Sequence, residues 1–285
     1  MFLYQQYHQM DSEEFNYESN NQFYYEEFLT EPLDLVAQNS QQELISIDNF
    51  LINHTLSKER RSLMVKWIIY VFDTIYGEQN NDSLFSRAVH LMDVFLKKTT
   101  VVYSDKDVHL IGCTCIQMAS QIEDASPIEL ETMYDTICHK KFTIDEINEF
   151  YQKTLETLEY NTNFPTSYSY LQNLSQFMFG QSQDYQSMYV QEEANNILRY
   201  CYRSYTMMQY NWLLLATTIL GYAIHVFKQV HGYYQDLQGK DSSSQDVMKL
   251  IEIAGVNLAD FENCFEILSE QFNCKCLEKH CSSQS

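Results

Sequence analysis

The chain has 285 residues and a formal charge of −21 at pH 7, and it contains only seven Gly and three Pro residues. So few helix-breaking residues favour an all-helical protein over a β-sandwich or a Rossmann fold, and a chain of this length can form two domains with separate cores. Lys and Arg never form a run longer than two. Because no cation cluster can follow a phosphate backbone, we expect a basic protein partner and no nucleic acid.

The first 45 residues differ in composition from the rest of the chain. Residues 1–57 contain no Lys or Arg, whereas acidic residues and Tyr recur. We therefore predict a flexible, acidic, Tyr-rich arm over 1–45. The alternatives are that its aromatic residues fold against the domain or a partner, and that the composition has no function. The first ten residues lack the basic start and apolar core of a signal peptide, which favours an intracellular location, in the nucleus, the cytoplasm or both.

The first set of predicted helices begins at residue 57. Apolar residues at helical spacing predict a first helix over about 58–76. A second, over about 81–98, is expected to be capped by Asn81 or Asp82. The third, over about 105–122, contains the small residues of "GCTC", which let neighbouring helices approach closely. We therefore predict that this third helix is the centre of a bundle.

Capping patterns mark three helix starts in this set. Ser104 with Asp107 forms a capping-box-like start for the third helix. The segment "SPIE", from Ser126 to Glu129, places Pro in the first turn and predicts the start of a fourth helix. Thr143 with Glu146 has the same capping pattern and predicts a fifth helix to about residue 158.

A second helical set follows the Pro-containing linker "NTNFPTSYSYL". Its longest apolar run, residues 212–227, is shorter than the about 20 residues that span a bilayer, so we predict a buried central helix and no membrane contact. Two similar helical sets in one chain predict an internal structural repeat. The predicted helices of this set cover about 166–178, 185–204, 209–228, 245–254 and 257–272.

The cysteine pattern gives no support for a metal site. Eight Cys residues lie mostly within helical apolar patterns, which is typical of reduced intracellular thiols. Because four ligands within the eight residues of "CKCLEKHC" would strain a tetrahedron, we predict free thiols, no metal and no cofactor. The ligand-type residues in this tail are Cys274, Cys276, His280 and Cys281.

Six segments stand out along about 225 residues of the chain: "RSLMVKWIIYV", "AVHLMDVFL", "LIGCTCIQMASQIED", "FTIDEINEFYQKTLETLEY", "FPTSYSYL" and "LIEIAGVNLADFENCFEIL". In this order they resemble segments of the cyclin family. The resemblance implies an all-α fold of two five-helix cyclin boxes in tandem. The expected boundaries are 1–45 for the arm, 46–163 and 164–272 for the two boxes, and 273–285 for the tail.

The resemblance also implies a function in cell division. A cyclin performs no catalysis itself; it binds and activates a cyclin-dependent serine/threonine protein kinase by pressing its third and fifth helices against a mobile kinase helix. The alternative is a cyclin-fold scaffold subunit of a larger assembly that activates no kinase. DNA-binding transcription factors also contain this fold, but the acidity of the chain argues against that function.

The implied kinase-binding surface departs from the family at two positions. Gln121 and Tyr151 stand where the family has a Lys and a Glu, so both charges are absent. Neutral hydrogen bonds in their place would weaken binding by about 1 kcal/mol per site without excluding it. The alternative for the apolar members of the surface is packing within the core. The implied kinase-binding residues are Met118, Gln121, Ile122, Glu123, Tyr151, Leu155 and Tyr160.

The first predicted helix carries two further features that the resemblance implies. Arg61 and Asp93 match the family's buried Arg–Asp pair, which has a structural role. Part of a groove that binds basic, leucine-containing peptides of kinase substrates is also present, and a modified groove or plain packing are the alternatives. The groove residues are Leu63, Met64 and Trp67, while Arg60, Lys66 and Tyr70 replace an apolar residue, an Asp and an acid, respectively.

Overall fold

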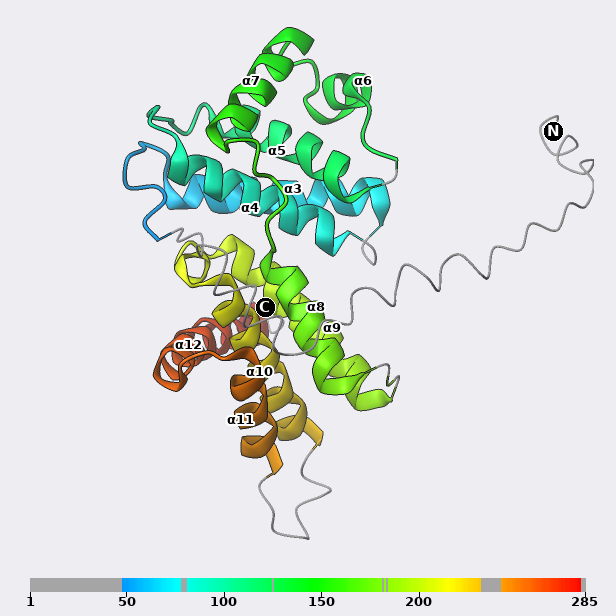
Figure 1. Ribbon diagram of the computed structural model, residues 1–285, viewed down its shortest axis with the longest axis vertical. Helices are drawn as coiled ribbons and strands as arrows, with labels where there is room; N and C mark the ends of the chain where they lie inside the picture. The colour runs from blue at the N-terminus through cyan, green and yellow to red at the C-terminus, as the bar shows by residue number, and fades with distance from the viewer. Residues whose placement is uncertain are drawn as a thin grey trace, which may run out of the picture. The chain divides into compact units, whose positions relative to one another are not determined.

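The structure is a computed structural model. It describes residues 48–77, 81–124, 126–180, 182, 184–231 and 242–282, with side chains except at 231, 242–244 and 273–282. The predicted arm over 1–45 therefore lies outside the described residues, and so do the side chains of the Cys- and His-containing tail. Within the described ranges every regular element is a helix, as Figure 1 shows.

The helices form two consecutive sets (Figure 1). The first contains α3 (Lys58–Tyr76), α4 (Asp82–Lys98), α5 (Val108–Glu123), the short α6 (Leu130–Thr132) with a π-helical turn at Met133–Ile137, and α7 (Ile144–Thr157). The second contains α8 (Ser167–Phe179), α9 (Tyr185–Arg203), a 3₁₀ turn at Met207–Gln209, α10 (Trp212–His231), α11 (Ser242–Ala254) and α12 (Leu258–Ser282).

Two helices form the centre of the first set. Every residue of α4 between Leu84 and Leu96 is buried, and α5 is buried from Ile111 to Ser120. The small residues of α5 allow this close packing: a Cβ on Gly112 would lie 2.4 Å from Sδ of Met64 on α3. The sequence prediction of a central third helix is therefore correct, but α4 shares that position because it packs against α3, α5, α8 and α9.

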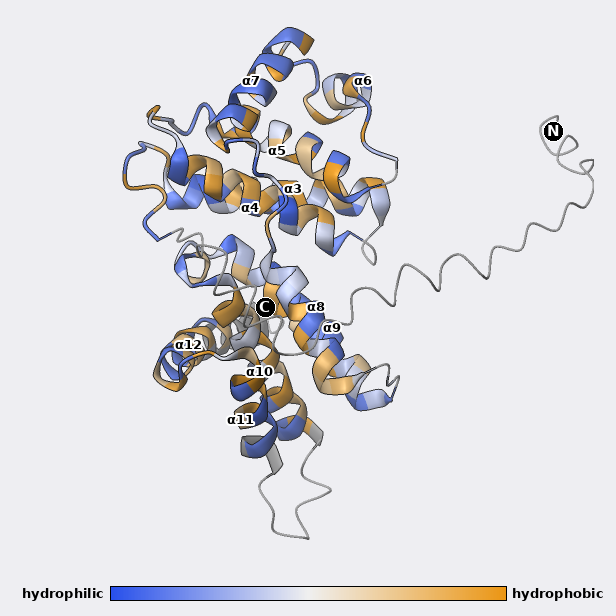
Figure 2. Ribbon diagram, in the orientation of Figure 1, coloured by the Kyte–Doolittle hydropathy of each residue, from blue (hydrophilic) through white to orange (hydrophobic). Residues whose placement is uncertain are grey.

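The second set is built around α10, which packs against α8, α9, α11 and α12. By length and composition alone, residues Trp212–Val230 could cross a membrane, with a mean hydropathy of 1.4. Most of this span is buried, however, and Figure 2 shows its apolar colouring inside the second set. Gly221 allows close approach here as well, since a Cβ would lie 2.9 Å from Cζ of Phe261. The apolar run is thus a central helix, as the sequence predicts.

The predicted start of the fourth helix is wrong. Residues 127–129 are not helical, Glu129 is extended, and α6 begins only at Leu130. The backbone N–H of Ile128 donates to Oγ of Ser120 (3.2 Å), and the Ile128 side chain is buried. This bond holds the segment against α5 in place of a first helical turn. The helix that follows is short and continues as the π-helical turn.

The other capping predictions have mixed outcomes. Thr143 and Glu146 form the predicted capping box at the start of α7. Oδ2 of Asp107 accepts from the Ser104 backbone N–H (2.8 Å), but this bond lies in a turn and α5 begins at Val108. Asn81 precedes α4 without capping it, because its Oδ1 accepts from Nη2 of Arg199 (2.7 Å), while its amide N–H groups donate to Asp73 and to the Gly77 carbonyl, both at 2.7 Å. Its side chain therefore bonds to the end of α3 instead.

Candidate functional site

Arg61 and Asp93 form a fully buried ion pair between α3 and α4. Nε of Arg61 donates to Oδ1 of Asp93 (2.9 Å), Nη2 donates to the other carboxylate oxygen, and Nη1 donates to the backbone carbonyl of Tyr202 on α9 (2.9 Å). Burial raises the pKa of Asp93, and the Arg61 guanidinium opposes that shift. Because every contact of the pair is internal, its role is to fix three helices.

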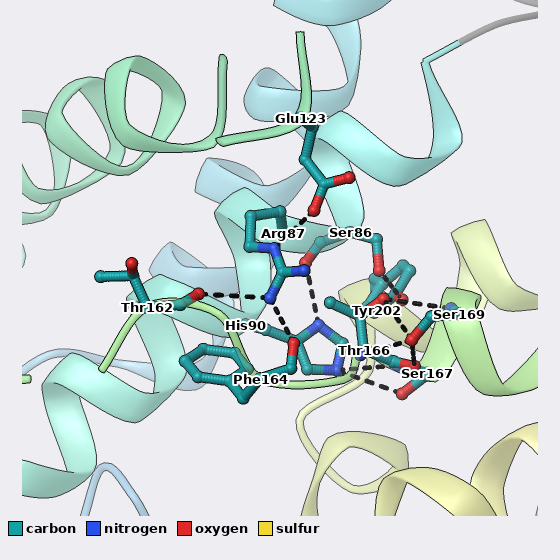
Figure 3. A network of polar contacts seen from close by, with 10 residues as sticks. All are labelled: Ser86, Arg87, His90, Glu123, Thr162, Phe164, Thr166, Ser167, Ser169 and Tyr202. Atoms are coloured by element: carbon teal, nitrogen blue, oxygen red, sulfur yellow. Dashed lines mark hydrogen bonds and ion pairs between the residues drawn. The ribbon is translucent and has the colours of Figure 1, made fainter. Parts of the chain in front are cut away.

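Arg87 forms a second connection from α4, shown in Figure 3. Its Nε donates to Oε1 of Glu123 at the end of α5 (2.6 Å). Its Nη1 donates to the backbone carbonyls of Thr162 (3.3 Å) and Phe164, in the linker between the two helical sets. Glu123, which the sequence places among the kinase contacts, is therefore engaged in this internal network. Its side chain is 21% exposed, so its place in the implied contact set stays a prediction.

His90 also belongs to the network of Figure 3, and its imidazole is neutral. Its Nδ1 faces the Ser86 carbonyl (2.9 Å), and its Nε2 faces the backbone N–H of Ser167 (3.3 Å). Since a carbonyl only accepts and an N–H only donates, the proton is on Nδ1 and Nε2 is an acceptor. Burial lowers the His90 pKa to about 3. The imidazole thus binds the first turn of α8 without carrying a charge.

The α5–α7 face brings together the two positions at which the family charges are absent. Tyr151 on α7 donates its phenol hydrogen to Oε1 of Gln121 on α5, at 2.6 Å. Burial raises the Tyr151 pKa, so the phenol keeps its proton and remains a donor. Gln121 is exposed and Tyr151 is half-buried. The pair therefore forms a neutral polar contact at the surface.

Apolar side chains adjoin this pair. Ile122 follows Gln121 and is 36% exposed, and Tyr160 is 64% exposed. Leu155 is half-buried on α7, one turn after Tyr151. Met118, by contrast, is only 1% exposed, so it is a core residue and its prediction as a contact is wrong. Helical spacing places it on the apolar side of α5 but does not tell which helix covers it.

The three predicted groove residues on α3 have different environments. Leu63 is 57% exposed, whereas Met64 is only 7% exposed and fills the space beside Gly112. Trp67 is half-buried, with its ring centre 5.0 Å from that of His109. Met64 is thus unavailable to a peptide, and the accessible part of the predicted groove consists of Leu63 and Trp67.

The sequence does not predict the buried network of Arg87 and His90. One signal for it is present: Arg87, His90 and Asp93 lie three residues apart within a run of α4 that is otherwise largely apolar. Ionisable residues at buried positions need internal partners. Their partners are mostly backbone carbonyls and hydroxyls from distant segments, which no spacing within α4 identifies. Among the described residues, no group of three or more His, Cys, Asp or Glu side chains is arranged to hold a metal ion.

Comparison with known proteins agrees with this architecture. The family model "Cyclin, N-terminal domain" matches residues 31–163. Cyclin-B2-2 of Arabidopsis thaliana is 26% identical over 216 residues, which are 75% of this chain and 48% of that protein. G2/mitotic-specific cyclin-2 of Medicago sativa is 31% identical over 117 residues, which are 41% of this chain and 34% of that protein. The chain thus spans about half the length of the first relative and less of the second.

A solved structure extends the comparison to both helical sets. The X-ray structure of a viral cyclin from herpesvirus saimiri superposes with a TM-score of 0.64 at 16% identity, covering 84% of this chain and 95% of that one. The fold defines an all-α protein with two cyclin boxes in tandem. The family model and these relatives together support a cyclin family protein.

Proposed function

We propose that this chain is a non-catalytic regulatory subunit that binds and activates a cyclin-dependent serine/threonine protein kinase through its α5–α7 face. The observation that carries the proposal is the hydrogen bond between Tyr151 and Gln121, flanked by exposed Ile122 and Tyr160. These residues lie where the family resemblance implies contact with a kinase. In this proposal the chain acts in cell division, in the nucleus, the cytoplasm or both.

The neutral pair suits a docking surface for a physical reason. A charged Lys or Glu must lose its hydration when a partner covers it, and that cost is recovered only if the partner supplies a matching charge. The Tyr151 hydroxyl and Oε1 of Gln121 already bond each other, so covering these two groups costs less, and the Gln121 amide N–H groups can donate to the partner. Affinity then comes mainly from the apolar area of Ile122, Leu155 and Tyr160. We expect the partner kinase to present an apolar helix with no charge opposite Gln121.

Activation follows from differential binding. A surface that contacts a mobile kinase helix only in its active position stabilises that position and increases its population. The buried Arg61–Asp93 pair contributes indirectly by fixing α3 and α4, on which α5 packs. The chain supplies no group to the phosphoryl transfer itself.

A scaffold function is the second candidate, and the same hydrogen bond favours it. If Gln121 and Tyr151 serve only to join α5 to α7, the two bonded groups are not left to recognise a kinase. The chain would then hold other proteins in a larger assembly. The two candidates predict different partners.

Purification of the tagged protein from its own cells distinguishes them. We expect a protein kinase to co-purify in stoichiometric amount and to be lost with Ile122→Asp. Ile52→Asp is the matched control, because Ile52 is also exposed but lies in a turn before α3, on neither α5 nor α7. Retention of the kinase by Ile122→Asp, or recovery of only non-kinase proteins, would contradict kinase activation through this face; the second result would support the scaffold.

A further inference from the structure

A hollow lies between the first two turns of α3 and the end of α9. One wall is the exposed, apolar side chain of Leu63, and another is the ring of Tyr205. The hollow is open to solvent and shares Leu63 with the predicted groove, whereas its other lining residues lie outside that groove. Its lining residues are Lys58, Glu59, Ser62, Leu63, Arg203 and Tyr205.

Lys58 and Arg203, the two cations that line this hollow, can each still bind an anion. Nζ of Lys58 lies over the Tyr205 ring, 4.5 Å from its centre. In the part of the chain that the structure describes, neither Lys58 nor Arg203 forms an ion pair. Nε of Arg203 is buried and has no hydrogen-bond partner. An unpaired buried donor is unfavourable, and an anionic acceptor in the hollow would remove that cost.

The charge of the surrounding surface points to the same ligand class. The chain as a whole has a charge of −21, yet the solvent side of α3 carries Lys58, Arg60 and Lys66. Glu59 also lines the hollow, so its two cations outnumber one carboxylate. A basic peptide would meet like charge here, whereas an acidic peptide meets complementary charge. This is the opposite of the preference that the family resemblance implies for the first helix.

We propose that this hollow binds an acidic linear segment of a partner protein. An apolar side chain of the segment packs against Leu63 and Tyr205, and a neighbouring carboxylate accepts hydrogen bonds from Arg203 and Lys58. The site goes beyond the proposed kinase regulation and does not depend on it, because these residues lie outside the α5–α7 face. A partner that docks here can therefore be present with or without a kinase.

Peptide binding to the full-length protein alone tests this site. Two fluorescein-labelled peptides share a central Leu-Phe pair, flanked by Asp in one and by Lys in the other, and fluorescence polarisation reports their affinity. We expect the Asp-flanked peptide to bind more tightly and to weaken as salt is added. Lys58→Glu and, separately, Arg203→Gln should each weaken it by about tenfold.

Lys66→Glu is the matched control, because it makes the same charge change on the same helix two turns away from Lys58. We expect it to weaken binding by less than about threefold, since screening limits its effect at that distance. Circular dichroism of each variant checks that the helices are intact. The proposal is overturned if the Lys-flanked peptide binds equally well, if neither peptide binds, or if Lys58→Glu and Lys66→Glu have equal effects. None of these results bears on kinase binding at Ile122, so the two proposals fail separately.

Discussion

The buried side of α4 and the exposed α5–α7 face both join polar residues from distant segments, but they use different chemistry. On α4, Arg61 binds Asp93 and Arg87 binds Glu123 as ion pairs with little or no exposure. On the α5–α7 face, Tyr151 and Gln121 meet as neutral groups in contact with solvent. Of these two regions, the interior one contains charges, each with a partner, whereas the centre of the proposed recognition surface contains none.

The buried ion pairs are required for the fold, whereas the exposed neutral pair is expected to serve partner binding. A buried charge that loses its partner has no water to replace it, so the internal pairs constrain the fold strongly. A solvent-exposed neutral pair can exchange its hydrogen bond for one with water at little cost. Changes on α4 should therefore affect stability, whereas changes at Gln121 and Tyr151 should affect binding and hardly alter stability.

The largest expected effect comes from Asp93→Ala. It leaves the buried Arg61 guanidinium without its counter-charge and should lower the free energy of unfolding by about 3–5 kcal/mol. Urea denaturation followed by circular dichroism measures this loss. Asp246→Ala is the matched control, since it removes the partly exposed partner of Lys228, and it should cost less than about 1 kcal/mol. Equal losses in the two variants would remove the distinction between buried and exposed pairs.

Gly112→Ala should have the next largest effect, because the new Cβ would lie 2.4 Å from Sδ of Met64. Met64 is enclosed and cannot move away freely. We expect a loss of about 1–3 kcal/mol, which outweighs the helix preference for Ala. The same substitution in a Met64→Val background should cost less, since the shorter side chain leaves room for the methyl group. An equal cost in both backgrounds would show that this contact does not limit the packing of α3 on α5.

Acidification tests the neutral His90 within the same buried region. Burial lowers its pKa from 6.5 to about 3. Below pH 6.5 the unfolded chain therefore binds a proton that the folded chain excludes, so stability is fully present above pH 6.5 and is lost as the pH falls toward 3. We expect this residue to account for about 1.4 kcal/mol of lost stability at pH 5.5.

The comparison that isolates this effect is between the native chain and His90→Gln, each unfolded by urea at pH 7.5 and at pH 5.5. The variant should lose less stability than the native chain over this interval, because it has no imidazole to protonate. If both chains lose the same amount, proton binding at His90 is not excluded by the fold.

The smallest effect is expected on the exposed face. A double-mutant cycle of Gln121→Ala and Tyr151→Phe should give a coupling energy of about 0.5–1 kcal/mol in urea denaturation, the usual net value of one neutral hydrogen bond. A coupling as large as the loss in Asp93→Ala would mean that this pair is part of the structural framework, and it would weaken the contrast with α4.

The sequence predicts the helices more reliably than the exposure of single residues. The capping box of Thr143 and Glu146 is local, so the sequence contains all of its parts, and α7 begins where expected. The segment after Ser126 carries an equally good local pattern, but a tertiary bond from Ile128 to Ser120 overrides it. Local signals are decisive only where no distant group competes for the same backbone atoms.

The candidate site shows the same limit. The sequence resemblance selects α5 and α7, but it cannot separate exposed Ile122 from buried Met118, which lies one turn earlier on the same helix. It also cannot show that Tyr151 bonds Gln121, because the two positions lie on different helices. Both facts depend on how α7 lies against α5, and side-chain periodicity within one helix carries no information about that placement.

Some hydrogen bonds from α3 and α4 to the linker and the second helical set end on main-chain atoms, and others end on side chains. Arg61 bonds the carbonyl of Tyr202, Arg87 bonds the carbonyls of Thr162 and Phe164, and His90 accepts from the N–H of Ser167. Every amino acid supplies a carbonyl, and every one except Pro supplies an N–H. The second box can therefore diverge in sequence where only its main chain is bound, but not at Arg199, which pairs with Asp73 and Asp82, or at Tyr202, whose hydroxyl meets Ser86.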